Sequence, residues 1–212
     1  VGGFPCQAFS VAGYQKGFGD ERGNVFFKII DVINLLKEKP KVLLLENVKN
    51  IYTHDKKNTF KRITEILEAN NYIVSSKIMN TSEYSNIPQN RERTYILCFL
   101  RKGLTTLGEK EFLNANSDLL FPTKSISDIK VISHFLEKNE VDEKYYYRQD
   151  KYNYKELSQK IIKLETFYQW RRVYVRENKS GVCPTLTANM GTGGHNVPLI
   201  KDAFGIIKKN EK

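Results

Sequence analysis

Strand-like and helix-like segments alternate through the first hundred residues, and this alternation limits the chain to a small set of folds. Apolar residues recur at three- and four-residue spacing over 25–37 and 58–70, which predicts two helices, the second with a polar cap at Asn58 or Thr59. Three short apolar runs predict strands, at 40–48, 72–80 and 93–100. Such alternation is typical of a doubly wound α/β sheet, so we predict a partial, Rossmann-like sheet of this kind over residues 1–100.

Two polar residues stand where such a sheet gathers its chemistry, at the carboxyl ends of strands. Glu46 closes the first apolar run, and Cys6 follows a Gly2-Gly3 turn, which in turn follows a strand if residues before Val1 form one. We therefore expect Cys6 and Glu46 on the same rim. A thiol on an uncrowded turn is either a nucleophile or a buried structural group. A carboxyl that is desolvated at a strand end has a raised pKa and can donate a proton or a hydrogen bond, whereas an exposed one has no such role.

Basic residues give the chain a net charge of +10, which has two contrasting interpretations. The charge is denser over 169–178, and it indicates either a well-solvated surface or a polyanionic partner such as nucleic acid. A second basic stretch, 89–93, precedes the third predicted strand. On an extended backbone Gln89, Arg91 and Arg93 point to one side, unless the stretch is an ordinary charged turn.

The three cysteines argue against a disulfide framework and against a zinc site. Cys6, Cys98 and Cys183 are far apart, odd in number and without the two-residue spacing of metal-binding pairs. We therefore expect no metal and a reducing, cytoplasmic compartment. No run of about eighteen apolar residues is present, so no membrane span is predicted, and no signal peptide is visible.

The composition changes after the third predicted strand, and this divides the chain into three parts. Residues 1–100 form the predicted α/β part. Residues 101–165 are richer in Lys, Glu, Asn and Tyr and are typical of a connecting segment with one or two helices, such as 125–137. Residues 166–212 alternate and turn like a small, mostly β region.

Taken together and in this order, three blocks of sequence resemble the DNA cytosine-5 methyltransferases of bacterial restriction–modification systems. The blocks are GGFPCQAFSVAGYQKGFGDERGNVFF (2–27), KVLLLENVKN (41–50) and YSNIPQNRERTYILCF (84–99). A fourth block, GVCPTLTANMGTGGHNVPLI (181–200), resembles the start of the family's target-recognition region. The resemblance implies the central part of an S-adenosylmethionine-dependent methyltransferase sheet over residues 1–100, and a truncated target-recognition region over 166–212.

The resemblance also implies roles for individual residues. Cys6 would attack carbon 6 of a cytosine flipped out of duplex DNA, Glu46 would hydrogen-bond N3 of the base, and Arg93 would donate to O2. Carbon 5 would then receive a methyl group from S-adenosylmethionine, after which its proton and Cys6 leave. Other residues match substrate- and DNA-contacting positions of the family: Phe4, Gln7, Gln89, Arg91 and Thr185. Two match cofactor-contacting positions: Pro5 and Val25.

The family's cofactor-binding blocks would lie before Val1 and its last two blocks after residue 200, so we expect a fragment that does not methylate DNA alone. The partners implied are double-stranded DNA and a complementing polypeptide that carries the other blocks. Two alternatives stay open. One is a non-catalytic DNA-binding or split-subunit fragment. The other is a transfer-RNA cytosine-5 methyltransferase, which is disfavoured because that branch carries Cys-Phe-Thr where this chain has Cys183-Pro184-Thr185.

Overall fold

The computed structural model describes most of the chain and divides it into two compact units. The described residues are 1–5, 24–102, 108, 120–124, 131–151, 153–171, 174–187, 190 and 197–208. The N-terminal unit comprises residues 1–80 and 92–124, and the C-terminal unit comprises residues 81–91 and 125–212. Among the described residues, no helix is both long and apolar enough to cross a membrane.

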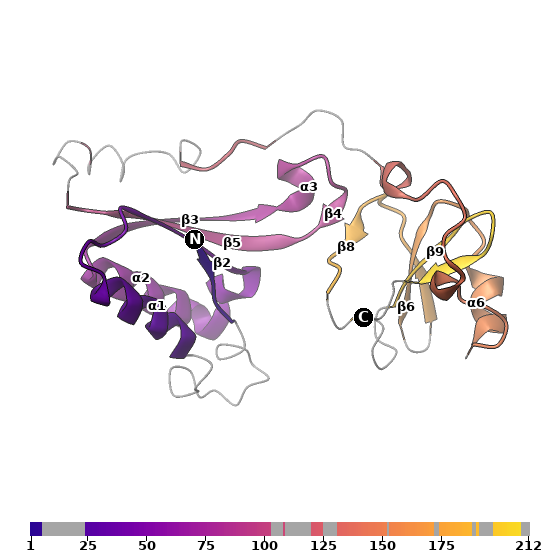
Figure 1. The fold of residues 1–212 in the computed structure, drawn as a ribbon, viewed down its shortest axis with the longest axis horizontal. Helices are drawn as coiled ribbons and strands as arrows, with labels where there is room; N and C mark the ends of the chain where they lie inside the picture. Colours follow the sequence, from indigo (N-terminus) through magenta and orange to yellow (C-terminus); the bar gives the residue numbers. More distant parts are fainter. Residues whose placement is uncertain are drawn as a thin grey trace. The chain divides into compact units, whose positions relative to one another are not determined.

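The N-terminal unit is built on a four-stranded sheet with the order β1-β2-β5-β3 (Figure 1). Its strands are β1 (Gly2–Gly3), β2 (Val42–Val48), β3 (Tyr72–Asn80) and β5 (Glu92–Leu100). The three strands predicted from the apolar runs are thus confirmed. β1 is parallel to β2, but β5 is antiparallel to both of its neighbours, β2 and β3. The sheet is therefore mixed.

The direction of β5 follows from its short connection to β3. Asn80 pairs with Glu92, so the chain leaves β3 and returns beside it through residues 81–91, which contain only the one-turn helix α3 (Thr81–Tyr84) and β4 (Gln89–Asn90). A parallel return would need a crossover of a dozen or more residues, usually a long helix. The parallel pairing that predominates in a doubly wound sheet is therefore absent at β5.

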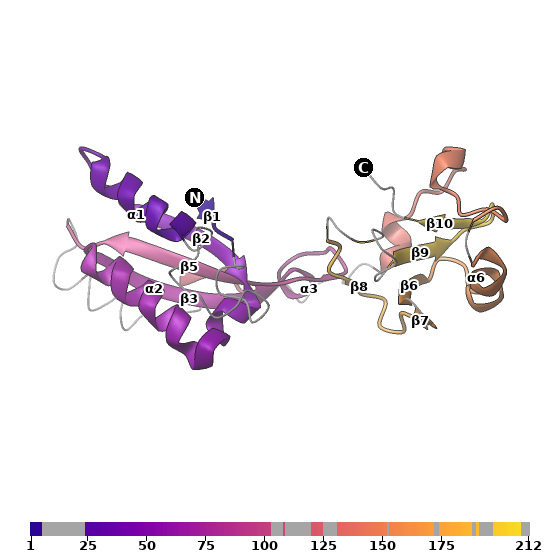
Figure 2. The same ribbon diagram turned by 90° about the horizontal axis from the view of Figure 1, so that it is seen from below.

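Two helices, α1 (Asn24–Leu35) and α2 (Asn58–Ala69), lie on one face of this sheet, as Figures 1 and 2 show. Residues on β2 alternate in burial, with Leu43, Leu45 and Asn47 buried and the residues between them half-buried. The buried members of this core come from both helices and from the sheet: Phe4, Phe26, Ile30, Ile33, Leu43, Leu45, Ile51, Ile63, Leu67, Tyr72, Ile96 and Cys98. In the described part of this unit the helices cover one face, whereas a doubly wound sheet is covered on both.

The entry into α2 differs from the polar cap predicted at Asn58 or Thr59. Two 3-10 helices, η3 (Lys49–Tyr52) and η4 (His54–Lys57), precede α2, and its N-cap residue is Lys57, with φ 76° and no side-chain capping bond. The Thr59 hydroxyl instead hydrogen-bonds His54 Nδ1 at 2.7 Å. The cap prediction is wrong because the left-handed backbone at Lys57 turns the chain into the helix.

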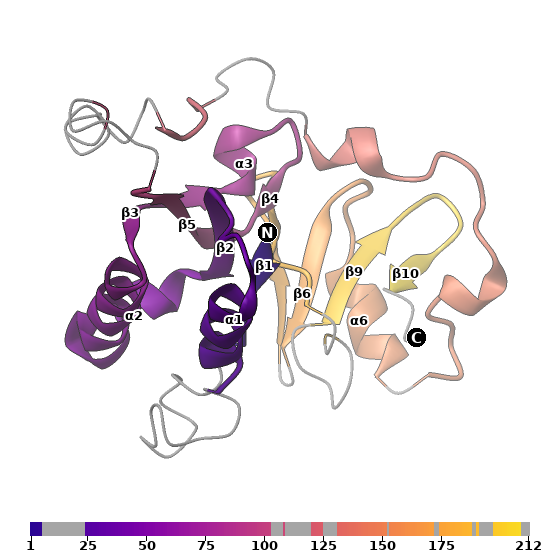
Figure 3. The ribbon, with the colours of Figure 1, turned by 60° about the vertical axis from the view of Figure 1, so that its left-hand side comes forward.

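The C-terminal unit is built on an antiparallel sheet with the order β10-β9-β6-β7. Its strands are β6 (Phe167–Arg171), β7 (Tyr174–Glu177), β9 (Val197–Lys201) and β10 (Ile206–Lys208). Figure 3 shows β6, β9 and β10 side by side with α6 (Tyr154–Lys160) against the sheet. Leu157 and Ile161 pack there against Tyr168 and Leu199. The four strands lie within 166–212, where the sequence predicted small β structure.

The segment before this sheet is less helical than predicted. Within the described part of 125–137, the structure has only the 3-10 helix η5 (Ile132–Phe135), which ends because Leu136 is extended. A second 3-10 helix, η6 (Glu143–Tyr145), follows. Tyr146 then forms an antiparallel bridge with Ile207 of β10, and Tyr146 is 3% exposed. The predicted helix at 125–137 is therefore wrong over its described residues.

Candidate active site and nucleic-acid interface

Two predicted catalytic residues meet on neighbouring strands of the N-terminal unit. Glu46 lies on β2 and Arg93 on β5, where Arg93 pairs in register with Val48. Their side chains leave the sheet on the face opposite α1 and α2, because the buried positions of both strands have the other parity. Arg93 Nε lies 2.8 Å from Glu46 Oε1, and the side chains are 15% and 41% exposed, respectively. The antiparallel register of β2 and β5 thus fixes this ion pair.

The surroundings of Glu46 differ from those expected at a strand end. β2 continues to Val48, so Glu46 stands inside the strand, on its less buried face. The side chain is 41% exposed and ion-paired, so the desolvation expected from the sequence is wrong. Burial instead falls on the next residue, Asn47, which is 2% exposed.

Asn47 is a site residue that the sequence reasoning missed. Its Nδ2 donates to the Phe4 carbonyl at 3.0 Å, and its Oδ1 accepts from the Val48 backbone N–H at 2.9 Å. Asn47 therefore fixes the segment that leads to Cys6. A detectable signal was present, because Asn47 is a polar residue on the face of β2 that carries Leu43 and Leu45.

The start of the chain lies beside Glu46. Gly3 pairs in parallel with Glu46, and a Cβ atom at Gly3 would lie 3.5 Å from Glu46 Oε2. The Gly-Gly pair is therefore a strand, β1, and the turn expected at these two residues is wrong. The Phe4 ring is 6% exposed and packs on Phe26 with centroids 5.3 Å apart. Cys6 and Gln7 lie outside the described residues.

Pro5 and Val25 are the two described residues expected to contact S-adenosylmethionine. Both are exposed, and Val25, which is 38% exposed, lies in the first turn of α1. Their side chains fit the role of an apolar contact to a ligand but supply no polar group for its ribose or its amino-acid end. These two residues therefore do not define how a bound cofactor would be oriented.

A second group of predicted residues meets in the C-terminal unit. β4 pairs in parallel with β8 (Cys183–Pro184), and we call this pair the β4–β8 ribbon. The Cys183 N–H donates to the Pro88 carbonyl at 2.6 Å, and Thr185 Oγ1 donates to the Asn90 carbonyl at 2.7 Å. Gln89 and Thr185 are thus brought close together, although almost a hundred residues separate them in the sequence.

The stretch 89–93 is not extended throughout, which is the condition under which Gln89, Arg91 and Arg93 would point to one side. Strand pairing is interrupted at Arg91, whose carbonyl accepts from the Thr81 N–H at 3.1 Å. Gln89 and Arg91 belong to the C-terminal unit and Arg93 to the N-terminal unit. The prediction failed because the stretch joins the two units.

The two described cysteines have the character of structural thiols. Burial raises the pKa of Cys98 to about 12 and that of Cys183 to about 11. At neutral pH both are therefore protonated and poor nucleophiles. Among the described residues, no group of three or more His, Cys, Asp or Glu is arranged to hold a metal ion.

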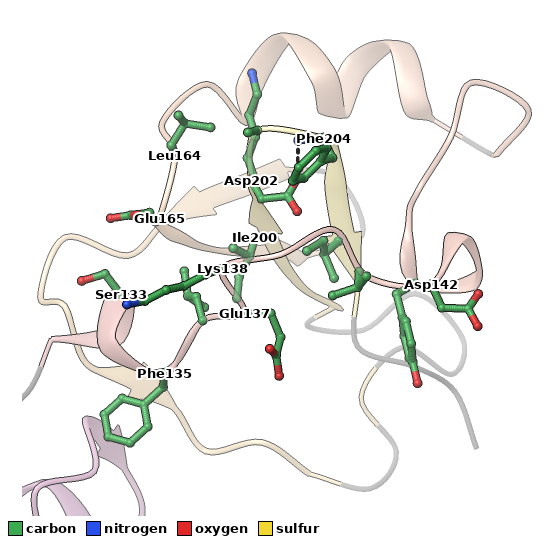
Figure 4. Close-up of a pocket in the computed structure, with 16 residues that line it drawn as sticks. Ser133, Phe135, Glu137, Lys138, Asp142, Leu164, Glu165, Ile200, Asp202 and Phe204 are labelled. Carbon is green, nitrogen blue, oxygen red and sulfur yellow. Dashed lines mark hydrogen bonds between the residues drawn. The ribbon is translucent and has the colours of Figure 1, made fainter.

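A pocket of about 840 Å³ lies in the C-terminal unit, apart from the predicted site residues. Figure 4 shows Ile200 with the carboxylates of Glu137, Asp142 and Glu165 around it. Two lining carboxylates already have partners, since Asp142 pairs with Lys144 at 2.9 Å and Asp202 accepts from the Phe204 N–H at 2.8 Å. The pocket is thus an apolar hollow whose rim carries both carboxylates and the two lysines Lys138 and Lys201.

Comparison with known proteins relates these features to one family. The family model of the C-5 cytosine-specific DNA methylases matches residues 1–212. The type II methyltransferase M.Bsp6I of Bacillus sp. (strain RFL6) is 48% identical over 211 residues, covering 98% of this chain and 62% of that protein. The orphan methyltransferase M.SPRI of Bacillus phage SPR is 37% identical over 221 residues, covering 91% of this chain and 49% of the phage protein. The chain thus spans less than two thirds of the length of these curated relatives.

A solved structure extends the comparison to the fold. The crystal structure of S. pombe Dnmt2 methyltransferase matches with a TM-score of 0.55 at 17% identity, covering 95% of this chain and 54% of that one. At this identity the match shows a shared fold only. The mixed α/β sheet described above is therefore that of a methyltransferase fold.

Proposed function

The chain belongs to the C-5 cytosine-specific DNA methylase family, and we propose that it contributes to methylation of cytosine at carbon 5 in double-stranded DNA. The observation that carries this proposal is the Glu46–Arg93 pair beside the Gly2–Phe4 segment, because that segment leads directly to Cys6. An acid, a cation and a thiol in this arrangement match the groups that the reaction needs.

The proposed chemistry begins with Cys6. Carbon 5 of cytosine is a poor nucleophile, so the Cys6 thiolate attacks carbon 6, forms an S–C bond and leaves carbon 5 with enamine character. Carbon 5 then takes up the methyl group, loses its proton, and the S–C bond breaks to restore the ring. Because carbon 5 is inaccessible in a stacked duplex, the base must first be flipped out. S-adenosylmethionine, when bound, supplies the activated methyl group, with Pro5 and Val25 as its apolar contacts in this chain.

Glu46 and Arg93 would hold the flipped base. The ion pair uses Glu46 Oε1, so a proton on Oε2 can be donated to, or shared with, N3 of cytosine, which is the acceptor. Arg93 also donates from Nη1 to the Glu92 carbonyl at 2.8 Å, which fixes the guanidinium so that another N–H can reach O2. The Phe4 carbonyl accepts one bond from Asn47 and retains a lone pair for the exocyclic amine.

The β4–β8 ribbon supports a contact with DNA. We assign Gln89, Arg91 and Thr185 to the DNA side of the site, together with Gln7. The segments that carry Gln89, Arg91 and Thr185 are joined by the ribbon and by the Thr185–Asn90 hydrogen bond, which places polar side chains from two distant segments together. Such polar groups suit phosphate and sugar contacts, which position a protein on a duplex.

Covalent trapping tests the nucleophile. Duplex DNA that contains 5-fluorocytosine cannot lose its carbon-5 substituent as a proton, so the Cys6 adduct should persist after methyl transfer. With S-adenosylmethionine and a polypeptide that carries the family's other blocks, it should be retained on denaturing gels. Cys6→Ser should abolish the adduct, whereas Cys183→Ala, which removes a buried thiol, should leave it. An adduct that survives Cys6→Ser would disprove the assigned nucleophile.

The expectation that the chain alone does not transfer methyl groups stays a prediction. It is tested by incorporation of labelled methyl into duplex DNA, first with the purified chain and then after addition of a polypeptide that carries the family's other blocks. Activity that appears only after mixing would support a complementing partner. Sequence-specific incorporation by the chain alone would contradict the expectation and leave the reaction assignment intact.

A further inference from the structure

Gly3 is a glycine at a position where the backbone does not require one. It lies in β1, which pairs in parallel with β2, and its φ is outside the left-handed region that favours glycine. In a strand, a glycine has no side chain to pack and loses more conformational entropy on folding than other residues do. Such a glycine often marks a place where a ligand approaches closely. The backbone of β1 therefore does not explain why position 3 lacks a side chain.

The two glycines of β1 face opposite sides of the sheet. Gly2 pairs with Leu45, and a Cβ atom added at Gly2 would lie 3.7 Å from Leu45 Cδ2, on the side of the core. Gly3 pairs with Glu46, and a Cβ atom added there would lie 3.5 Å from Glu46 Oε2 and 3.7 Å from the Glu46 carbonyl oxygen. These distances are ordinary van der Waals contacts, so an alanine fits at either position.

The space at Gly3 is open apart from Glu46. Among the described residues, and chain neighbours aside, the atoms within 4 Å of the added Cβ atom all belong to Glu46, and Gly3 itself is exposed. The nearest of these atoms is Oε2, whereas the ion pair with Arg93 uses Oε1. A side chain at position 3 would therefore cover the carboxyl oxygen that the ion pair does not engage.

We propose that Gly3 keeps the approach to Glu46 Oε2 clear, so that the edge of the flipped cytosine can reach this oxygen. The inference rests on the proposed function and deepens it, because it makes Gly3 a positioning residue that acts through Glu46. A methyl group at position 3 would stand in contact with Oε2 and take up space that the base needs. Larger side chains at this position should weaken the hydrogen bond between Glu46 and N3 further.

The rate at which Cys6 is trapped tests the inference. Duplex DNA with 5-fluorocytosine at every cytosine is mixed with S-adenosylmethionine, the full chain and a polypeptide that carries the family's other blocks, and formation of the adduct is followed over time. Gly3→Ala should slow trapping by about tenfold to a hundredfold, which is the effect of losing one hydrogen bond to a charged group. Gly3→Val should slow it further, because its side chain is larger.

Gly2→Ala is the matched control. It adds the same methyl group to the same strand, but on the side of Leu45, where the group packs against the core. Trapping by Gly2→Ala should therefore proceed at the rate of the unsubstituted chain. Melting curves and hydrogen exchange of the β1 amides establish that both alanine variants are folded and keep β1 paired with β2.

A double-mutant cycle separates access to Glu46 from a general effect on β1. In the Glu46→Ala background no carboxyl is left for the base to reach, so adding Gly3→Ala should slow trapping little further, and the two effects should not add. A merely structural role of Gly3 would instead slow trapping by the same factor in both backgrounds.

The possible outcomes separate this inference from the proposed function. If Gly3→Ala traps as fast as Gly2→Ala, the positioning role of Gly3 is disproved and the proposed function stands. If Gly3→Ala slows trapping by the same factor with and without the Glu46 carboxyl, access to Oε2 is disproved and the proposed function again stands. If the unsubstituted chain forms no adduct when the complementing polypeptide is present, the proposed function fails, and the inference that rests on it fails as well.

Discussion

In the N-terminal unit the predicted catalytic residues Glu46 and Arg93 lie on neighbouring strands of one sheet, whereas in the C-terminal unit the predicted DNA-contacting residues come from segments far apart in the chain. Glu46 and Arg93 are positioned by the register of β2 and β5, which pair over the whole length of β2. Gln89 and Thr185 are positioned by a ribbon of two residues on each side and by the Thr185–Asn90 hydrogen bond.

This difference bears on how firmly each group is held. A long ladder on a dry core opens only when the whole unit unfolds, whereas a short ribbon with few hydrogen bonds can open locally at a lower free energy. We therefore expect a rigid catalytic pair and an adaptable DNA-contacting group.

The largest effects are expected in the two cores. Leu67 on α2 and Leu199 on β9 are both 0% exposed. Leu67→Ala and Leu199→Ala should each lower the free energy of unfolding of their own unit by about 2–5 kcal/mol, because each leaves a cavity. Denaturant titration measures the loss of unfolding free energy, and hydrogen exchange shows which of the two units has lost stability.

Exposed leucines are the matched controls for this prediction. Leu36 and Leu164 are 46% and 54% exposed, so Leu36→Ala and Leu164→Ala should change stability by less than about 0.5 kcal/mol. A cost below about 1 kcal/mol for Leu199→Ala would mean that the C-terminal sheet has no cooperative core. The N-terminal unit would then be a folded unit and the C-terminal unit a loosely packed one.

Asn47→Ala should have the next largest effect. Asn47 is 2% exposed and holds the Phe4 carbonyl, so its loss leaves buried polar groups without partners and should cost about 1–3 kcal/mol. Hydrogen exchange of the Gly3 amide should become faster as β1 loosens. Asn86→Ala, at an exposed position, is the control. Unchanged exchange at Gly3 would show that β1 is held by the β2 ladder alone.

The elements of the N-terminal unit could be predicted because their signals are local. The two helices and three strands appear at the expected positions, since burial against one core imposes a period in each segment. The direction of β5 could not be predicted, because it depends on how β3 returns through residues 81–91 and not on the apolar run itself. The Lys57 cap was missed because its left-handed backbone has no signature in a lysine side chain.

The site could be predicted only in part, for the same physical reason. The sequence pointed to Glu46 and Arg93, but nothing local shows that β2 and β5 are neighbours whose register joins the two side chains. The contact of Thr185 with Asn90 is a tertiary hydrogen bond that no periodicity encodes.

A double-mutant cycle on Glu46 and Arg93 tests whether the catalytic pair is held firmly. We expect a coupling energy of about 1–2 kcal/mol, because the hydrogen bond is charged but Glu46 is 41% exposed. The reference is the Lys49–Glu92 pair, with the same kind of contact at 2.7 Å but side chains 47% and 40% exposed, for which we expect at most about 0.5 kcal/mol. Equal coupling energies in the two cycles would mean that the lower exposure of Arg93 does not strengthen its ion pair with Glu46.

Thr185→Val should have the smallest effect. It tests whether the β4–β8 ribbon is held less firmly than the paired strands β2 and β5. The substitution keeps the shape of the side chain and removes the 2.7 Å bond to the Asn90 carbonyl, so it should cost about 0.5–1 kcal/mol at this half-buried position. Thr185→Ser, which keeps the hydroxyl, should cost less. Exchange of the Cys183 amide, which donates to Pro88, reports on opening of the ribbon. If Thr185→Val lowers the free energy of unfolding as much as Asn47→Ala does, the β4–β8 ribbon is held as firmly as the paired strands β2 and β5. Gln89 and Thr185 would then be as rigidly positioned as Glu46 and Arg93.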